Sequence, residues 1–290
     1  MTPKRSFFFL FVALALSAGP LAHLCEARND NAAVRYWSAF SVMRDSSIST
    51  EQARQLNTIL EGKVPYDDSQ FKDLIEKNHL SLEIMARATS LPTCDWGLDY
   101  SFGSDEPVEY ARSALVLGRL NVLYALHLMS IGDTNAAVET LTVGLRFSQD
   151  VANGGTLFAT LAADRLISDH LRVIVSAERN SRLSSAQRST LQEAVTRLGP
   201  DGLDWQSALS REFAVHHVEF AHNRQALAVL SRIESGYSEA LKNSSELPGL
   251  ENAVRSAPSS MKQLIPDPHR VIEAKDDLSA QIAQARSSLR

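Results

Sequence analysis

The chain has 290 residues, of which 44% are hydrophobic and 22% are charged, as in an average globular protein. This composition excludes a largely disordered chain, a collagen-like fibre and a small disulfide-dense protein. The formal net charge of −5 offers no basic field that would attract nucleic acid. With 13 glycines, 10 prolines and 7% aromatic residues, the totals favour helices over a many-stranded β-sandwich.

The N-terminus has the layout of a secretory signal peptide. Lys4 and Arg5 precede the uninterrupted apolar run 7–16, and small residues and Pro20 follow it. We expect a signal peptide over residues 1–27, with cleavage after Ala27 and a secreted or periplasmic mature chain. The alternative is an uncleaved segment that tethers the protein to a membrane, although the run is shorter than the roughly 20 apolar residues that span a bilayer.

The chain has two cysteines, Cys25 and Cys94. Cleavage after Ala27 leaves Cys94 as a buried or free thiol, whereas an earlier cut permits a Cys25–Cys94 disulfide in an oxidising compartment. Lipid attachment to Cys25 is a further alternative. It is disfavoured because Ala22 and Leu24 reverse the order that a bacterial lipoprotein normally shows before its cysteine.

The mature chain is predicted to be all-α, because apolar residues recur at helical spacing and no segment alternates like a strand. Ser49 with Gln52, and Ser184 with Gln187, have the spacing of capping boxes. Short connections favour antiparallel helix hairpins. We expect a helical domain over residues 28–243, then a Pro-containing loop and a short C-terminal helix over 244–290. The expected helices are 31–44, 51–62, 67–90, 108–131, 134–150, 156–178, 184–198, 204–243 (with a possible break near Gly236) and 271–289.

The stretch 120–145 contains a pattern found in tetratricopeptide (TPR) units. Gly132-Asp133 forms a helix–helix turn, and the small residues Ala137 and Gly144 allow two antiparallel helices to pack closely. No neighbouring 34-residue copy is evident. The sequence therefore leaves two architectures open, a TPR-like superhelix and a non-repetitive helical bundle.

Four blocks carry a resemblance to a known group of proteins. They are NAAVRYWSAF at 31–40, CDWGLDYSFG at 94–103, ARSALVLGRL at 111–120 and the stretch from Gly132 to Ile167. Over roughly residues 31–175 the chain resembles uncharacterised exported α-helical proteins of environmental bacteria. That group has no established activity, so the resemblance implies an exported location and a helical architecture only.

The segment 91–106 is the most unusual part of the mature chain, since it interrupts the helices with aromatic and acidic residues. Loops on rigid scaffolds often carry binding residues, and aromatic side chains dominate interfaces. We therefore identify the loop as a possible partner-binding site. The alternative is that its aromatic residues fasten the loop to the helices while its acids face water. The candidate residues are Asp95, Trp96, Asp99, Tyr100 and Phe102.

A second candidate is the helical segment around residues 212–222. Glu212, His216 and Glu219 share one helix face, and Glu219 with His222 forms an E-x-x-H pair like those of di-iron bundles. No second such pair is present, so the simpler interpretation is a solvated Glu212–His216 pair beside a core-facing His217. The sequence also lacks a nucleophile elbow, a zinc-protease motif, a phosphate-binding loop and a dinucleotide fingerprint.

These observations favour an exported, non-catalytic helical scaffold that binds a protein or a component of the cell envelope. We expect no cofactor and no metal. The alternative is an exported enzyme, metal-dependent in one version, that uses the acidic and histidine residues of the 212–222 helix. The sequence gives no specific reason to assign an enzymatic activity.

Overall fold

A computed structural model describes residues 30–44, 48–105, 108–180 and 182–290. Within these residues the chain is helical and contains no strand, which confirms the all-α prediction. The expected signal peptide, 1–27, lies outside the described residues. The α-helices are α2 (Ala32–Val42), α3 (Thr50–Leu60), α4 (Lys72–Lys77), α5 (His79–Ala88), α6 (Tyr110–Ser130), α7 (Thr134–Ala152), α8 (Leu157–Arg179), α9 (Ser185–Arg197), α10 (Trp205–Glu219), α11 (Arg224–Lys242), α12 (Leu247–Ser256), α13 (Ser259–Lys262) and α14 (Pro268–Ser288); the 3-10 helices are η1 (Asp68–Gln70), η2 (Tyr100–Asp105) and η3 (Ser244–Glu246).

Local sequence signals set several helix starts. Both predicted capping boxes form, at Ser49 with Gln52 and at Ser184 with Gln187. In each, the serine hydroxyl accepts the backbone N–H of the glutamine, and the glutamine side-chain oxygen accepts the backbone N–H of the serine. Asp133 caps α7 by accepting the N–H of Ala136. These bonds satisfy donors that helix starts otherwise leave unpaired.

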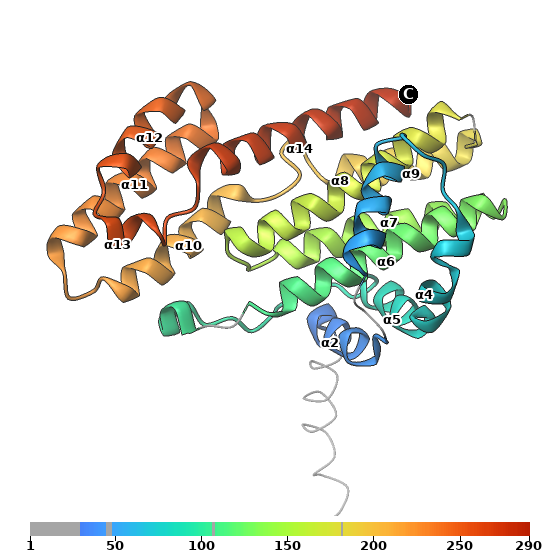
Figure 1. Cartoon of the computed structure of the whole chain (residues 1–290), viewed down its shortest axis with the longest axis horizontal. Helices are drawn as coiled ribbons and strands as arrows, with labels where there is room; N and C mark the ends of the chain where they lie inside the picture. Colours follow the sequence, from blue (N-terminus) through green and yellow to red (C-terminus); the bar gives the residue numbers. More distant parts are fainter. Residues whose placement is uncertain (1–29, 45–47, 106–107, 181) are drawn as a thin grey trace, which may run out of the picture.

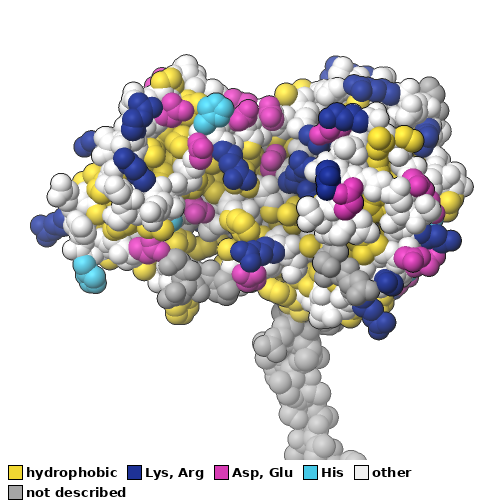
Figure 2. Space-filling model, viewed as in Figure 1, with side chains coloured by type: hydrophobic (Ala, Val, Ile, Leu, Met, Phe, Trp, Pro, Cys, Tyr) yellow, Lys and Arg dark blue, Asp and Glu magenta, His cyan; other side chains and the backbone are white. Residues whose placement is uncertain are grey.

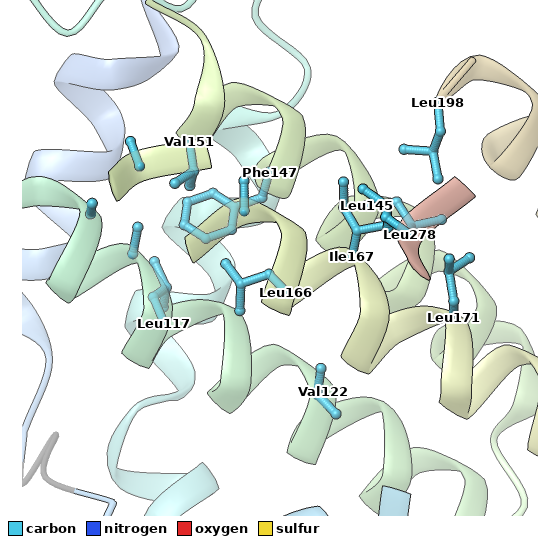
Figure 3. Packing of buried hydrophobic residues seen from close by; sticks show 14 of the residues in the cluster. Leu117, Val122, Leu145, Phe147, Val151, Leu166, Ile167, Leu171, Leu198 and Leu278 are labelled. Carbon is cyan, nitrogen blue, oxygen red and sulfur yellow. The ribbon is translucent and has the colours of Figure 1, made fainter. Parts of the chain in front are cut away.

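The centre of the molecule is formed by α6, α7 and α8, which pack against one another in all three pairings. Leu117, Phe147 and Leu166, one from each helix, lie close together in the interior (Figure 3). Farther along the bundle, Leu278 of α14 reaches the same apolar cluster beside Ile167. Burial of such side chains contributes about 1.5–3 kcal/mol each, so this cluster is the main source of stability.

Close approach of the three helices depends on Gly144 of α7. A Cβ at this position would lie 1.9 Å from Nε2 of His170 and 2.4 Å from Oδ1 of Asn121. His170 of α8 is fully buried, with Nδ1 2.6 Å from the Leu166 carbonyl and Nε2 2.9 Å from Asn121 Oδ1 of α6. Burial lowers the pKa of His170 to about 4, so the ring is neutral at pH 7. The glycine thus makes room for a buried polar contact between α6 and α8.

The remaining helices extend this centre (Figure 1). Helix α2 packs mainly on α5, and α3 crosses over the bundle in front of α8. Helices α10 to α13 form one end of the molecule, with α11 packed on both α10 and α12. The C-terminal helix α14 returns along α8 and α9, so it joins that end to the central bundle.

Three predicted segments differ from the structure. Residues 67–90 are not one helix but η1, α4 and α5, and the side chain of Asn78 bonds the Arg44 backbone at the junction of α4 and α5. The 204–243 segment breaks at residues 220–223 rather than near Gly236, because Asn223 caps α11 by accepting the N–H of Ala226. The Pro-containing stretch 247–268 is largely helical, since prolines stand at the first turns of α12 and α14.

Helix α6 is long and apolar enough to cross a membrane by length and composition alone. However, 56% of its apolar window is buried inside the protein, and central helices of folded domains pass the same test.

On the face shown in Figure 2, a hollow separates the end that contains α11 and α12 from the end that contains α9. Basic and acidic side chains are mixed around it, so this face has no single-signed patch.

Candidate functional site

The loop after α5 is fastened to the end of α7. Trp96 is 8% exposed and stacks on Tyr110, with 4.0 Å between the ring centroids. Its indole N–H donates to the backbone carbonyl of Asp150 at 2.8 Å. The hydroxyl of Tyr36, from α2, donates to the carboxylate of the same aspartate at 2.7 Å. Asp150 therefore connects the loop and α2 to the central bundle.

The other candidate residues of the loop divide between structural contacts and the surface. The Tyr100 hydroxyl donates to the carbonyl of Gly154 in the α7–α8 turn. Asp95 and Asp99 are exposed, and their side chains accept backbone N–H groups within the loop. Phe102 is 64% exposed. Solvent therefore reaches Asp95, Asp99 and Phe102, while Trp96 is buried and Tyr100 is engaged in the fold.

Cys94 is a free, buried thiol in this loop. Its sulfur lies 3.6 Å from the Asp150 carbonyl, a weak S–H bond at most. Burial, with the nearby Asp150 charge, raises the pKa of the thiol above its usual range, so the group is a poor nucleophile here. Cys25, its possible disulfide partner, lies outside the described residues.

In the predicted histidine and glutamate cluster on α10, the two histidines exchange the places that the simpler sequence interpretation gave them, a solvated His216 and a core-facing His217. His216 is 5% exposed and His217 is the partly exposed ring, 3.1 Å from Glu234 of α11. Phe213 and His216 face inward together because they lie three positions apart on the helix. The sequence pattern alone did not fix this rotation of α10.

His216 lies between two carboxylates of its own helix. Its Nε2 is 3.8 Å from Glu212 and its Nδ1 is 3.6 Å from Glu219, both too long for hydrogen bonds. Glu212 uses its other oxygen to accept the N–H of Leu157 at the start of α8. His222 is exposed. In the part of the chain that the structure describes, no group of three or more His, Cys, Asp or Glu side chains is arranged to hold a metal ion.

A groove of about 680 Å³ lies between α7, the α9–α10 connection and α10. Its cationic side chains are Arg146, Arg197 and Arg211, contributed by three different helices. Polar residues such as Gln149 and Asn153 line the same space. The volume is within the range of small-molecule pockets, about 300–1,000 Å³.

The acidic residues of this groove are already engaged in the fold. Asp150 has a nearly buried side chain that accepts from Tyr36 and lies 3.2 Å from Arg146. Burial raises the pKa of the Asp150 carboxyl, although the Tyr36 hydrogen bond and Arg146 oppose this. Asp204 caps α10 by accepting the N–H of Ser207, and the Ser207 side chain, together with this backbone bond, lowers the pKa of the carboxyl. The groove therefore presents mainly guanidinium groups to a ligand.

Sequence reasoning did not identify these arginines. They are separated by 51 and 14 positions, and each stands on a helix face whose neighbours the sequence does not reveal. Arg146 and Arg197 also have acidic residues four positions away, the spacing of an ordinary solvated pair. Only the packing of α7, α9 and α10 brings the three together.

Comparisons with protein-family models, with curated proteins and with solved structures find no match for this chain. Functional inference therefore rests on the geometry of the protein itself. The strongest features for that purpose are the groove lined by Arg146, Arg197 and Arg211, and the arrangement of the neighbouring loop.

Proposed function

We propose that this chain is an exported helical scaffold that binds a polypeptide partner, and that its arginines bind the carboxylate side chains of that partner. The observation that carries the proposal is the convergence of Arg146, Arg197 and Arg211 on one groove. Guanidinium groups bind carboxylates through paired N–H donors, which gives orientation as well as attraction. The partner segment lies along the groove with its acidic residues toward α7, α9 and α10.

The exposure of the arginines supports this proposal. The side chains of Arg146 and Arg197 are 46% and 67% exposed, whereas the Asp150 side chain is 4% exposed. Arg211 is partly buried and donates to the Gly155 carbonyl at 3.3 Å, which holds its guanidinium at the wall. The whole chain has a net charge of −5, so the excess of cationic side chains in the groove is opposite in sign to the charge of the protein.

The architecture and location of this scaffold remain part of the proposal. The Gly132-Asp133 turn and the close packing at Gly144 support a TPR-like hairpin of α6 and α7. The apolar run 7–16 supports export to the periplasm or the exterior. N-terminal sequencing of the exported protein tests the expected cut after Ala27.

The binding proposal is tested by selecting peptides from a random display library against the wild-type protein. We expect selected sequences to be enriched in Asp and Glu. The double variant Arg146→Gln/Arg197→Gln should weaken the best peptide by at least about tenfold, since each charge-assisted bond contributes roughly 1.5–3 kcal/mol. The matched control Arg54→Gln/Arg87→Gln removes the same charge from exposed, ion-paired sites on α3 and α5.

Equal loss of affinity in both double variants would mean that overall charge, rather than the groove, attracts the peptide. Selection of peptides without acidic enrichment would also contradict the proposal. Circular dichroism and thermal unfolding of each variant establish that the helices remain intact.

A further inference from the structure

A second cavity lies on another side of the bundle, between α6, α8 and the connection from α3 to η1. It has a volume of about 540 Å³. The connection 61–67 passes over the C-terminal half of α8 and forms one wall; in Figure 1 it belongs to the blue-to-cyan segment at the right of the molecule. Gly62, with φ of +73°, makes the turn that starts this connection.

The body of this cavity is apolar. Met129 and Leu126 of α6 and Val173 of α8 form its inner side, and Val64 and Pro65 of the connection form its outer side. Val64 is 41% exposed, so an apolar surface faces the cavity and solvent. Methionine adapts its shape to an apolar ligand. These walls suit a hydrocarbon chain better than a hydrated polar ligand.

The polar part of the cavity is cationic. Its charged lining residues are Lys63, Arg172 and Arg182, and none of the described residues that line it is acidic. Lys63 is paired with Glu61 at 2.6 Å, and Arg172 lies 3.9 Å from Asp169. Arg182 forms no ion pair with any described residue. The Arg182 guanidinium is therefore available to an anion at the edge of an apolar space, and Arg172, whose charge Asp169 balances in part, lines the same edge.

We propose that this cavity binds an amphipathic anion, a single carboxylate attached to an aliphatic chain. The carboxylate lies at Arg172 and Arg182, with Asn180 as a further hydrogen-bond donor, and the chain packs on Met129 and Val173. The site shares no lining residue with the α7–α9–α10 groove, so it is independent of the polypeptide-binding proposal. One protein molecule binds one ligand.

Isothermal titration calorimetry of the full chain with straight-chain alkyl carboxylates of increasing length tests this site. Each methylene buried in the cavity should strengthen binding about fourfold, until the chain exceeds the cavity. Alkyl alcohols of matched length should bind at least about tenfold more weakly, because they lack the charge that the arginines meet. Alkyl phosphates and anionic phospholipid vesicles serve as the competing anion sources.

Two variants locate the binding. Arg182→Gln should weaken the carboxylates about tenfold and leave the alcohols unchanged. Ser176→Trp should abolish binding of both, since Ser176 lines the cavity and an indole there fills it. The control is Arg179→Gln, at the last residue of α8 and three positions before Arg182; Arg179 lines the adjoining cavity but not this one, so its replacement should not change affinity.

Affinity that does not depend on chain length overturns the proposal, as does equal binding of carboxylates and alcohols. Binding to vesicles or to alkyl phosphates without binding of the monomeric carboxylates also overturns it. If Arg179→Gln and Arg182→Gln weaken binding equally, the attraction is a general charge effect and the assigned site is wrong. Thermal unfolding of every variant confirms that each remains folded.

Discussion

Two buried aspartates, Asp150 of α7 and Asp169 of α8, are held in different ways. Asp150 accepts a hydrogen bond from Tyr36, and its backbone carbonyl accepts one from Trp96. Asp169 is fully buried among Arg119, Arg165 and Arg172, whose nearest nitrogens lie 3.2–3.9 Å away. Neither of its oxygens has a hydrogen-bond partner among the described residues.

The difference separates two uses of a buried carboxylate. Asp150 gathers segments that are distant in sequence, since it bonds α2 and the loop after α5. Asp169 instead neutralises a cluster of guanidinium groups on α6 and α8. Burial raises the pKa of both carboxyls, and the arginines around Asp169 act in the opposite direction. We therefore expect Asp169 to contribute through its charge and Asp150 through the geometry of its bonds.

Removal of the Asp169 charge should have the largest effect. Asp169→Ala leaves three arginines without their shared anion, and loss of one partner of a buried pair costs about 3–5 kcal/mol. We expect the lower end of that range because the arginine side chains are 19–35% exposed. Urea unfolding followed by circular dichroism measures the loss. Added salt should restore part of it, and an effect insensitive to salt would contradict the charge-balancing role.

Trp96→Phe should destabilise the protein by about 1–3 kcal/mol. The ring stack on Tyr110 is retained, but the Asp150 carbonyl loses the indole donor and keeps the Asn153 backbone N–H at 3.3 Å and the weak contact with Cys94. The control is Trp37→Phe, because Trp37 is 47% exposed and should change the unfolding free energy by less than about 0.5 kcal/mol. Equal effects of the two substitutions would show that the indole hydrogen bond is unimportant.

Asp150→Asn should have a smaller effect, about 1 kcal/mol. The Tyr36 hydroxyl can still donate to the amide oxygen, so the substitution removes mainly the attraction to Arg146, whose side chain is 46% exposed. Chemical denaturation of Asp150→Asn, Arg146→Gln and the double variant isolates that attraction. If Asp150→Asn costs as much as Asp169→Ala, the proposed distinction between the two aspartates is wrong.

Much of the fold could be predicted from local sequence. Helical periodicity identified the central helices, and the Ser49 and Ser184 capping boxes marked two helix starts. The break in the 204–243 segment was misplaced because Gly236 is more conspicuous than Asn223. In the structure Gly236 continues the helix and packs beside Leu250, whereas Asn223 supplies the cap. A glycine inside a helical pattern marks close packing as readily as an end.

The buried charges and both cavities could not be predicted in the same way. Periodicity shows which residues share a helix face, but it does not show which other helix covers that face. Arg119 meets Asp169 only because α6 packs on α8, and Arg146 meets Arg211 only through the placement of α10. The aromatic loop was recognised as unusual, yet the burial of Trp96 depends on the end of α7, about 50 residues later in the chain.

A separate prediction concerns the pH dependence of stability and involves Asp164, on the same helix as Asp169. Burial raises the pKa of Asp164 from 3.8 to about 7, and the charges of Asp277 and Asp169 act in the same direction. Between those pH values the folded protein retains a proton that the unfolded chain releases, so this group lowers the unfolding free energy as pH rises. His170 has the opposite effect, because burial lowers its pKa from 6.5 to about 4 and the unfolded chain binds the extra proton.

In the wild-type protein these two contributions oppose each other between about pH 4 and 6.5. Asp164→Asn removes the contribution that decreases as pH rises and leaves the contribution of His170. The unfolding free energy of the variant should therefore rise more steeply with pH over this window than that of the wild-type protein. The contribution of Asp150 is common to both proteins and cancels in the difference, whereas that of Asp169 cancels only in part because its charge acts on Asp164. Urea unfolding of both proteins at several pH values measures that difference. If the difference stays constant from about pH 4 to 7, Asp164 does not retain its proton in the folded state, and the bundle tolerates a partly buried carboxylate charge near Asp169.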